Sequence, residues 1–102
     1  MIIVYLTCAD DKEADVIVEA LLNKRLVACA KRLPIESAFW WEGKKDAVDE
    51  VLVLFETIEE KFDEIEEVVR ELHSYETPML FSVQVHRATN EVNIWLRDEL
   101  KK

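Results

Sequence analysis

Apolar residues alternate along the chain between continuous runs and spaced positions, and this pattern predicts the elements. Residues 1–7 form a short apolar run rich in β-branched side chains, which is typical of a strand buried on both faces. Asp10 or Asp11 then offers a helix cap. The next apolar residues recur at helical spacing and predict one buried helix face: Ala14, Ile17, Val18, Leu21 and Leu22.

The middle of the chain predicts a long hairpin. Residues 26–30 are apolar, Pro34 interrupts the run, and residues 37–41 resume it with three aromatic side chains. Because proline donates no hydrogen bond to a ladder, we expect an edge strand or a bulge at Pro34. A turn at residues 42–45 holds the only glycine, and the next strand, around residues 51–55, is again apolar on both faces.

A second helix is predicted after this hairpin. Thr57 with Glu60 three residues later has the pattern of a capping box. The helical stripe that follows consists of Ile58, Phe62, Ile65, Val69 and Leu72. Residues 74–77, followed by Pro78, end the helix. Residues 79–86 then alternate as in a fourth strand, and a short last helix follows them.

The order of these elements predicts an α+β fold of the ferredoxin-like βαββαβ type with an extra C-terminal helix. Right-handed crossovers place both crossover helices on one face of a four-stranded antiparallel sheet, with the first and third strands in the centre. Those two strands are apolar on both faces, so a monomer would expose a large apolar surface. We therefore expect a closed homo-oligomer in which the bare sheet faces pack on one another.

Composition narrows the classes of partner. The chain has 102 residues, which fits a single domain over 1–102. Thirteen basic and 22 acidic side chains give a net charge of −9, which argues against nucleic acid and against an anionic membrane surface. No leader pattern and no apolar run of about 20 residues is present. Two cysteines in apolar segments favour reduced thiols and a cytoplasmic location.

Candidate chemistry is sparse, and each candidate has an ordinary structural explanation. Cys29 is either a small buried hydrophobe or a soft-metal ligand brought near its copies by symmetry, whereas Cys8, at the end of a strand, is expected to be half-exposed. His73 either favours the helix dipole as a cation or belongs to a site, and His86 is expected to be solvated. No nucleophile with an activating base stands out, so we expect no enzyme.

The adjacent residues Trp40 and Trp41, before a hairpin tip, are the most unusual feature of the sequence. Their side chains point to opposite faces of the strand and bury a large area. Packing between subunits explains them, and the alternative is an aromatic wall of a cleft between subunits.

Three segments together resemble the CutA divalent-cation tolerance proteins. They are Leu-Val-Ala-Cys-Ala at 26–30, Ser-Ala-Phe-Trp-Trp-Glu-Gly-Lys at 37–44 and Leu-His-Ser-Tyr-Glu-Thr-Pro at 72–78. The similarity spans the whole chain and is greatest to short, highly charged members from hyperthermophilic archaea. It implies a thermostable homotrimer that binds Cu²⁺ or another divalent cation, with no firmly attached cofactor. The alternative is a structural or interaction trimer, natural or engineered, with little ligand function.

The resemblance also implies site residues. A metal ion is expected at Cys29, His73 and Glu76, near a subunit boundary. The pocket between subunits is expected to hold Lys31, Trp41, Lys44, Glu56 and Tyr75.

Several positions depart from the family pattern. The family usually has lysine where this chain has Glu56, asparagine where it has Lys31, and proline where it has Ser74, and a Tyr-Leu pair is replaced at Val92 and Asn93. These departures indicate a divergent or redesigned member. Because Glu56 replaces the lysine of the family and reverses its charge, an anionic ligand bound by that lysine is not expected in this chain.

Overall fold

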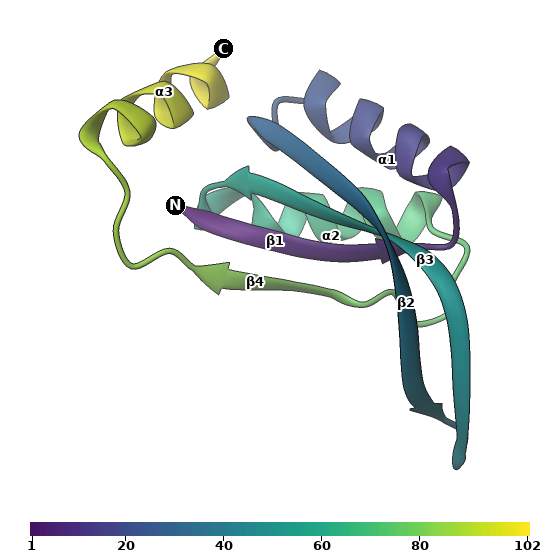
Figure 1. Cartoon of the computed structure of the whole chain (residues 1–102). Coiled ribbons are helices and arrows are strands. Elements are labelled where there is room, and N and C mark those ends of the chain that lie inside the picture. Colours follow the sequence, from purple (N-terminus) through teal and green to yellow (C-terminus); the bar gives the residue numbers. More distant parts are fainter.

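The computed structural model describes residues 1–102 and contains the elements of the predicted fold in the predicted order (Figure 1). The strands are β1 (Ile2–Cys8), β2 (Cys29–Trp41), β3 (Lys44–Thr57) and β4 (Leu80–Gln84). The helices are α1 (Asp11–Asn23), α2 (Phe62–Leu72), α3 (Asn90–Lys101) and a short 3₁₀ helix, η1 (Glu59–Lys61). The prediction of a ferredoxin-like chain with an extra C-terminal helix is confirmed.

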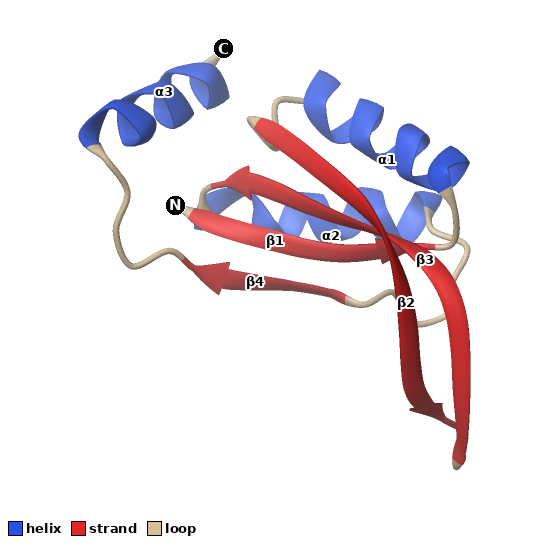
Figure 2. Ribbon diagram, viewed as in Figure 1, coloured by secondary structure: helices blue, strands red, loops and turns tan.

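The four strands form one antiparallel sheet in the order β2-β3-β1-β4. β1 and β3 are central, as the sequence predicts, and α1 and α2 lie together on one face (Figure 2). The edge position of β2 explains how the strand accommodates Pro34. The register runs without a bulge through the pair Pro34 and Val51. An edge strand has a ladder on one side only, so it tolerates a residue without an amide donor.

The main core lies between the sheet and the two helices. Alternate residues of β1 and β3 point toward α1 and α2 and are buried, in keeping with the two-residue period of a strand. The helices contribute residues spaced three and four apart. The most completely buried members include Val4, Leu6, Ile17, Leu21, Val53, Phe55, Ile65 and Val69.

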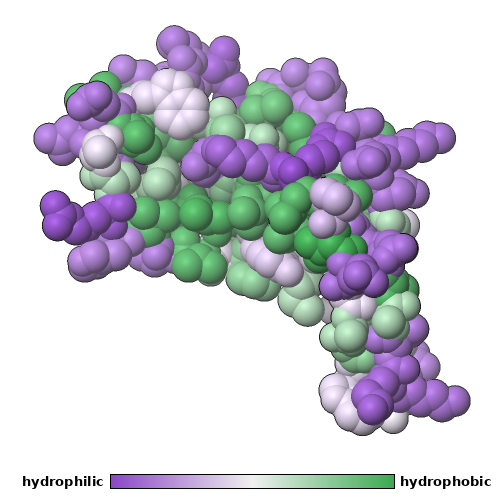
Figure 3. Space-filling view, in the orientation of Figure 1, coloured by the Kyte–Doolittle hydropathy of each residue, from purple (hydrophilic) through white to green (hydrophobic).

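The other face of the sheet is also apolar, but no helix covers it. Ile3 and Tyr5 of β1 lie beside Leu54 of β3 and beside β4, and the Tyr5 and Phe81 rings stack with centroids 4.4 Å apart. Phe81 is 41% and Val83 is 52% exposed. Figure 3 shows hydrophobic side chains gathered across this face. The prediction that two helices would leave one apolar sheet face bare is therefore confirmed.

Strands β2 and β3 form a hairpin that extends well beyond the rest of the molecule (Figure 1). With the hairpin included, the chain measures 45 × 26 × 22 Å. A two-residue turn joins them, with φ of +50° at Glu42 and +79° at Gly43. Positive φ at both turn positions matches the twist of the flanking strands. Glycine adopts this conformation freely, whereas Glu42 carries a Cβ that disfavours it.

The start of the second helix differs from the prediction. Thr57 is the last residue of β3 and is fully buried, and its hydroxyl donates a hydrogen bond of 2.6 Å to the carbonyl of Leu26. It caps no helix. The 3₁₀ helix η1 comes first, and α2 begins at Phe62 without a side-chain cap. The capping-box prediction for Thr57 and Glu60 is wrong because the buried carbonyl competes for the same hydroxyl.

Helix α3 packs at the end of the sheet near the chain's N-terminus (Figure 1). Thr89 caps it, and Leu96 and Leu100 form a second small core with Ile58. The Arg25 guanidinium also donates to the Glu99 carbonyl over 2.9 Å. No helix in the structure is long and apolar enough to cross a membrane.

We expect the substitution Glu42→Asn to stabilise the protein, because asparagine tolerates positive φ better than glutamate and Asn-Gly is the favoured pair in such turns. The expected gain in the free energy of unfolding is about 0.5–1 kcal/mol, read from the denaturant midpoint at a fixed chain concentration. Glu42→Ala is the control and should give no gain, since alanine keeps the steric cost. Equal midpoints for the asparagine variant and the unmodified chain would contradict the assignment of strain to Glu42.

Candidate functional site

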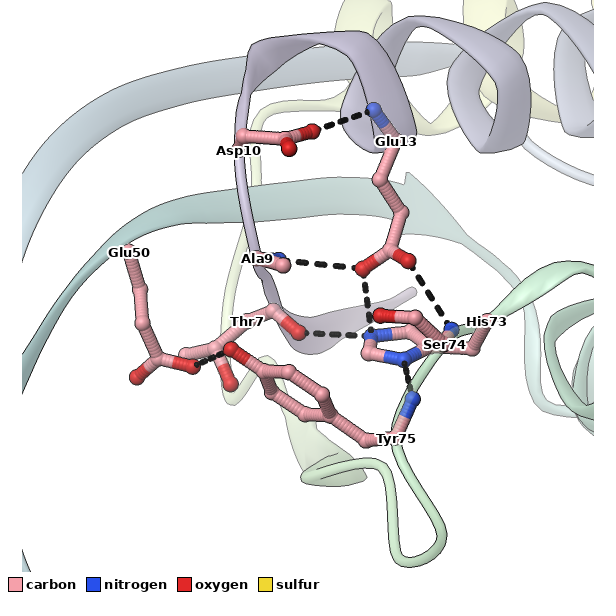
Figure 4. Close-up of polar contacts among 8 residues, drawn as sticks. All are labelled: Thr7, Ala9, Asp10, Glu13, Glu50, His73, Ser74 and Tyr75. Atoms are coloured by element: carbon pink, nitrogen blue, oxygen red, sulfur yellow. Dashed lines mark hydrogen bonds and ion pairs between the residues drawn. The ribbon is translucent and has the colours of Figure 1, made fainter.

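Titratable side chains from four parts of the chain converge where β1 ends, and Figure 4 draws those of Glu13, Glu50, His73 and Tyr75. Cys8 closes β1, Glu13 lies in the first turn of α1, and Glu50 lies in β3. His73 and Tyr75 come from the segment that follows α2. We call these five residues the β1-end cluster. Such a gathering of partly or fully buried ionisable groups is a candidate site in any chain of this size.

Glu13 joins two loops. One carboxylate oxygen accepts the Ala9 amide at 3.0 Å and the other accepts the Ser74 amide at 2.8 Å. Partial burial raises the pKa of Glu13, but the donors of Ala9 and Ser74 outweigh burial and hold this pKa below its ordinary value. The carboxylate therefore fastens the segment after α2 to the start of α1.

Both ring nitrogens of His73 are occupied. Nδ1 accepts the Tyr75 amide at 3.0 Å, so the ring proton lies on Nε2, which donates to the Thr7 carbonyl at 2.8 Å. The side chain is fully buried, and Nε2 is 3.5 Å from Glu13 Oε1. His73 thus terminates α2 with both ring nitrogens hydrogen-bonded inside the chain. The sequence left open a cation that favours the helix dipole or a member of a site, and the structure turns the ring inward to a strand carbonyl.

Cys8 is fully buried and belongs to the main core. The expectation of a half-exposed thiol is wrong, because α1 folds back over the end of β1. Burial, reinforced by the charge of Glu13, raises the pKa of the thiol to about 12. The sulfur nevertheless lies in a group of three metal-ligand types: one ligand atom each from Cys8, Glu13 and His73, all within 4.8 Å of one another.

Tyr75 and Glu50 complete the cluster. The Tyr75 hydroxyl donates to Glu50 Oε2 over 2.6 Å, and Glu50 is only 8% exposed. Desolvation, followed by this bond and the Glu50 charge, raises the pKa of Tyr75. Glu50 is thereby spared the cost of a buried carboxylate without a donor.

A second polar group lies on the bare sheet face. Lys31 Nζ is 2.5 Å from Glu56 Oε1 and 3.2 Å from Cys29 Sγ. The bond from Lys31 lowers the pKa of Glu56. Cys29 is half-buried at the start of β2. The two departures from the family pattern, at positions 31 and 56, thus meet in one ion pair. The family's lysine stands on β3 at position 56, whereas in this chain the lysine stands on β2 at position 31.

The remaining predicted site residues lie apart from these groups within one chain. Trp41 and Lys44 pair at the hairpin tip, where Trp41 is 45% exposed, and Glu76 is exposed after α2. Cys29 is opposite Glu56, which is opposite Ile3 near the start of β1, whereas His73 contacts Thr7 near its other end. One chain therefore does not bring Cys29 to His73, and a site using both needs two chains.

Sequence reasoning missed Glu13 and Glu50 as members of the β1-end cluster. Glu13 did carry a signal, since Asp10 with a glutamate three residues later is a capping pattern. Asp10 caps the Glu13 amide at 2.9 Å as that pattern requires, but the Glu13 carboxylate reaches onward to Ala9 and Ser74. Glu50 gave no signal, because a glutamate at a strand position reads as solvent-facing.

These observations define a class: a ferredoxin-like chain with an open apolar sheet face, a projecting hairpin and a polar cluster at the end of β1. Residues 2–99 match the family model described as CutA1 divalent ion tolerance protein. The chain belongs to the CutA1 divalent ion tolerance family.

Relatives from hyperthermophiles are similar over their full length. The divalent-cation tolerance protein CutA of Thermotoga maritima is 40% identical over 98% of this chain and 99% of its own. The crystal structure of CutA1 from Pyrococcus horikoshii has a TM-score of 0.93 and 36% identity, covering all of both chains. The structure of the periplasmic divalent cation tolerance protein CutA from Archaeoglobus fulgidus has a TM-score of 0.94 and 37% identity, covering 98% and 99%. These relatives are named for cation tolerance and not for a reaction.

We expect Glu13→Gln to lower the free energy of unfolding by about 1–2 kcal/mol at pH 7, because an amide has one oxygen for the two backbone donors. The folded-state pKa of Glu13 is lowered, so its stabilisation is present above about pH 4.5 and is lost as the pH falls through the lowered pKa. The difference between the variant and the unmodified chain should therefore shrink in acid. Denaturant unfolding of both proteins at pH 7 and in acid, below the lowered pKa of Glu13, measures this difference.

The matched control is Glu19→Gln, an exposed position on the same helix. Its effect should be small at both pH values. A Glu13→Gln deficit that stays constant into acid would show that the carboxylate charge does not matter.

Proposed function

We propose that this chain is a homotrimer that binds divalent cations and acts by binding rather than by catalysis. The match over residues 2–99 to the divalent ion tolerance family carries the proposal. Relatives from three hyperthermophilic organisms bear the same name at 37–40% identity, which supports carrying the role over. A net charge of −9 favours cations over nucleic acid or anionic membranes as partners.

The bare sheet face supports self-association. Half-buried Ile3, Tyr5 and Leu54 adjoin the exposed Phe81 and Val83 on one continuous surface. Burying such a side chain fully is worth about 1.5–3 kcal/mol, whereas an exposed ion pair gives at most about 1 kcal/mol. Apolar contact therefore favours assembly more than charge pairing does. The number three follows from the resemblance to CutA proteins.

Light scattering coupled to size exclusion should give a mass three times the 12.0 kDa of the chain. Dilution into the low nanomolar range should leave the trimer intact, because several large apolar side chains per subunit leave water. Tyr5→Lys is the informative variant, since it puts a charge on the bare face without touching the core beneath it. Monomer at micromolar concentration in the unmodified chain would refute the trimer.

The proposed cation site is shared between subunits. It uses Cys29, His73 and Glu76, beside a pocket formed by Lys31, Trp41, Lys44, Glu56 and Tyr75. The separation of Cys29 and His73 along β1 supports a site made by two chains. Cu²⁺ is the proposed probe, because it leads the divalent affinity order and accepts imidazole, carboxylate and thiolate ligands.

Calorimetric titration with Cu²⁺ tests the cation binding. We expect saturating, stoichiometric heat in the unmodified chain and a loss of at least tenfold in affinity in Cys29→Ala and His73→Ala. Glu59→Gln, at an exposed position away from the proposed site, is the control and should bind as the unmodified chain does. Unchanged binding in both site variants would leave the acidic surface as the explanation.

The second candidate is a structural or interaction trimer with little ligand function. One observation favours it: both nitrogens of His73 are already engaged inside the chain. Weak, non-saturating heat with Cu²⁺ and an intact trimer would select this candidate.

The proposed compartment is the cytoplasm, since both cysteines are free. The Archaeoglobus fulgidus relative is described as periplasmic, which names the alternative. Fractionation of cells that express the chain distinguishes the two.

A further inference from the structure

The β1-end cluster contains a set of metal-ligand atoms that lies inside one chain. Cys8 offers a thiol, Glu13 a carboxylate and His73 an imidazole, with the three atoms within 4.8 Å of one another. They come from β1, α1 and the residue that ends α2, so three separate elements hold them in place. Cys8 and the His73 side chain are fully buried, which removes them from casual contact with solvent.

The chemistry of this set fits one class of ion. Sulfur, nitrogen and carboxylate ligands suit a four-coordinate ion such as Zn²⁺, with bonds of about 2.0–2.3 Å. Ligand atoms around such an ion stand roughly 3.3–3.8 Å apart. His73 Nε2 and Glu13 Oε1 are already 3.5 Å apart. The Cys8 sulfur lies within 4.8 Å of both atoms, so a shift of at most about 1–1.5 Å brings all three ligands to one ion.

The local charge also favours a cation. Glu13, Asp10 and Glu50 all raise the pKa of the Cys8 thiol through their charge, whereas Arg32 acts in the opposite sense. The potential at the sulfur is therefore negative on balance. A divalent cation lowers the energy of this arrangement, and it supplies the charge that a buried thiolate needs.

We propose that Cys8, Glu13 and His73 form an intrachain site for a four-coordinate divalent cation of the Zn²⁺ class. The proposal rests on the proposed cation binding, but it places the ion inside one protomer and not at the subunit boundary. It also uses Cys8 where the shared site uses Cys29, so the two sites are separable by their cysteines.

Loading the site moves two protons. The Cys8 thiol releases its proton to solvent as sulfur binds the ion. His73 Nε2 gives up its proton to bind the ion, and Nδ1 takes one up, so the ring stays neutral and one proton is released in total. A protonated Nδ1 no longer accepts the Tyr75 amide, and the Thr7 carbonyl loses its donor. Ion binding therefore frees the backbone at Tyr75.

The test uses Co²⁺ as a spectroscopic probe on the full chain carrying Cys29→Ala. Cys8 is then the only thiol, and the variant need not alter the core. We expect a near-ultraviolet sulfur-to-metal charge-transfer band and tetrahedral visible bands that saturate at one ion per chain, with one proton released per ion. Zn²⁺ should abolish these bands by competition.

The reciprocal variant, Cys8→Ala, keeps Cys29 and should show no such band at the same Co²⁺ concentration, with its fold checked by circular dichroism. In ¹⁵N spectra of Cys29→Ala, the Tyr75 amide should shift on Zn²⁺ addition more than the Glu59 amide does. Cys29→Ala protein without the charge-transfer band overturns the intrachain site, whatever Cys8→Ala does.

The two proposals fail differently. If Cys29→Ala gives no band but Cu²⁺ still binds with dependence on Cys29, the intrachain site is overturned and the shared site remains. If Cys29→Ala gives the band while Cu²⁺ affinity is indifferent to Cys29, the intrachain site stands and the shared site is overturned.

Discussion

The central strands β1 and β3 are apolar on both faces, while α1 and α2 cover only one. This imbalance governs the rest of the molecule. On the covered face it produces a core of fully buried side chains such as Val4 and Phe55. On the bare face Tyr5 stacks on Phe81, which is 41% exposed. Exposing so much apolar surface to water is unfavourable, so this second face favours contact with protein from outside the chain, as in the proposed trimer.

Surface charge plays a smaller part in stability than its abundance implies. Pairs such as Arg70 with Glu66 join exposed side chains on one helix, and each is worth about 0.3–0.5 kcal/mol. In the hairpin, Glu36 lies directly opposite Asp49, an arrangement of like charges that weakens a strand pair. The acidic surface therefore affects which partners the protein attracts, and apolar burial makes the larger contribution to the free energy of unfolding.

The fold could be predicted from the sequence because it depends on the spacing of apolar residues and on the order of helices and strands along the chain. Doubly apolar runs identified the central strands, and Pro34 identified an edge. The site could be predicted less well, because it depends on which polar side chain pairs with which hydrogen-bond partner. Thr57 has the sequence of a cap but donates to a buried carbonyl, and His73 has the position of a cation at a helix C-terminus but turns inward to Thr7. Such choices are made by neighbours distant in sequence, which a local pattern does not contain.

The position of β1 has a consequence for how the chain is made. β1 precedes both of its partners along the chain. It pairs on one side with β3 and on the other with β4, so that Ile2 is opposite both Thr57 and Gln84. Neither partner exists while β1, α1 and β2 are being synthesised. Until Leu80–Gln84 emerges, β1 keeps one open edge that can template pairing with other chains. Completion of the sheet therefore waits for β4, and a nascent chain can misassemble along this edge of β1 until β4 has emerged.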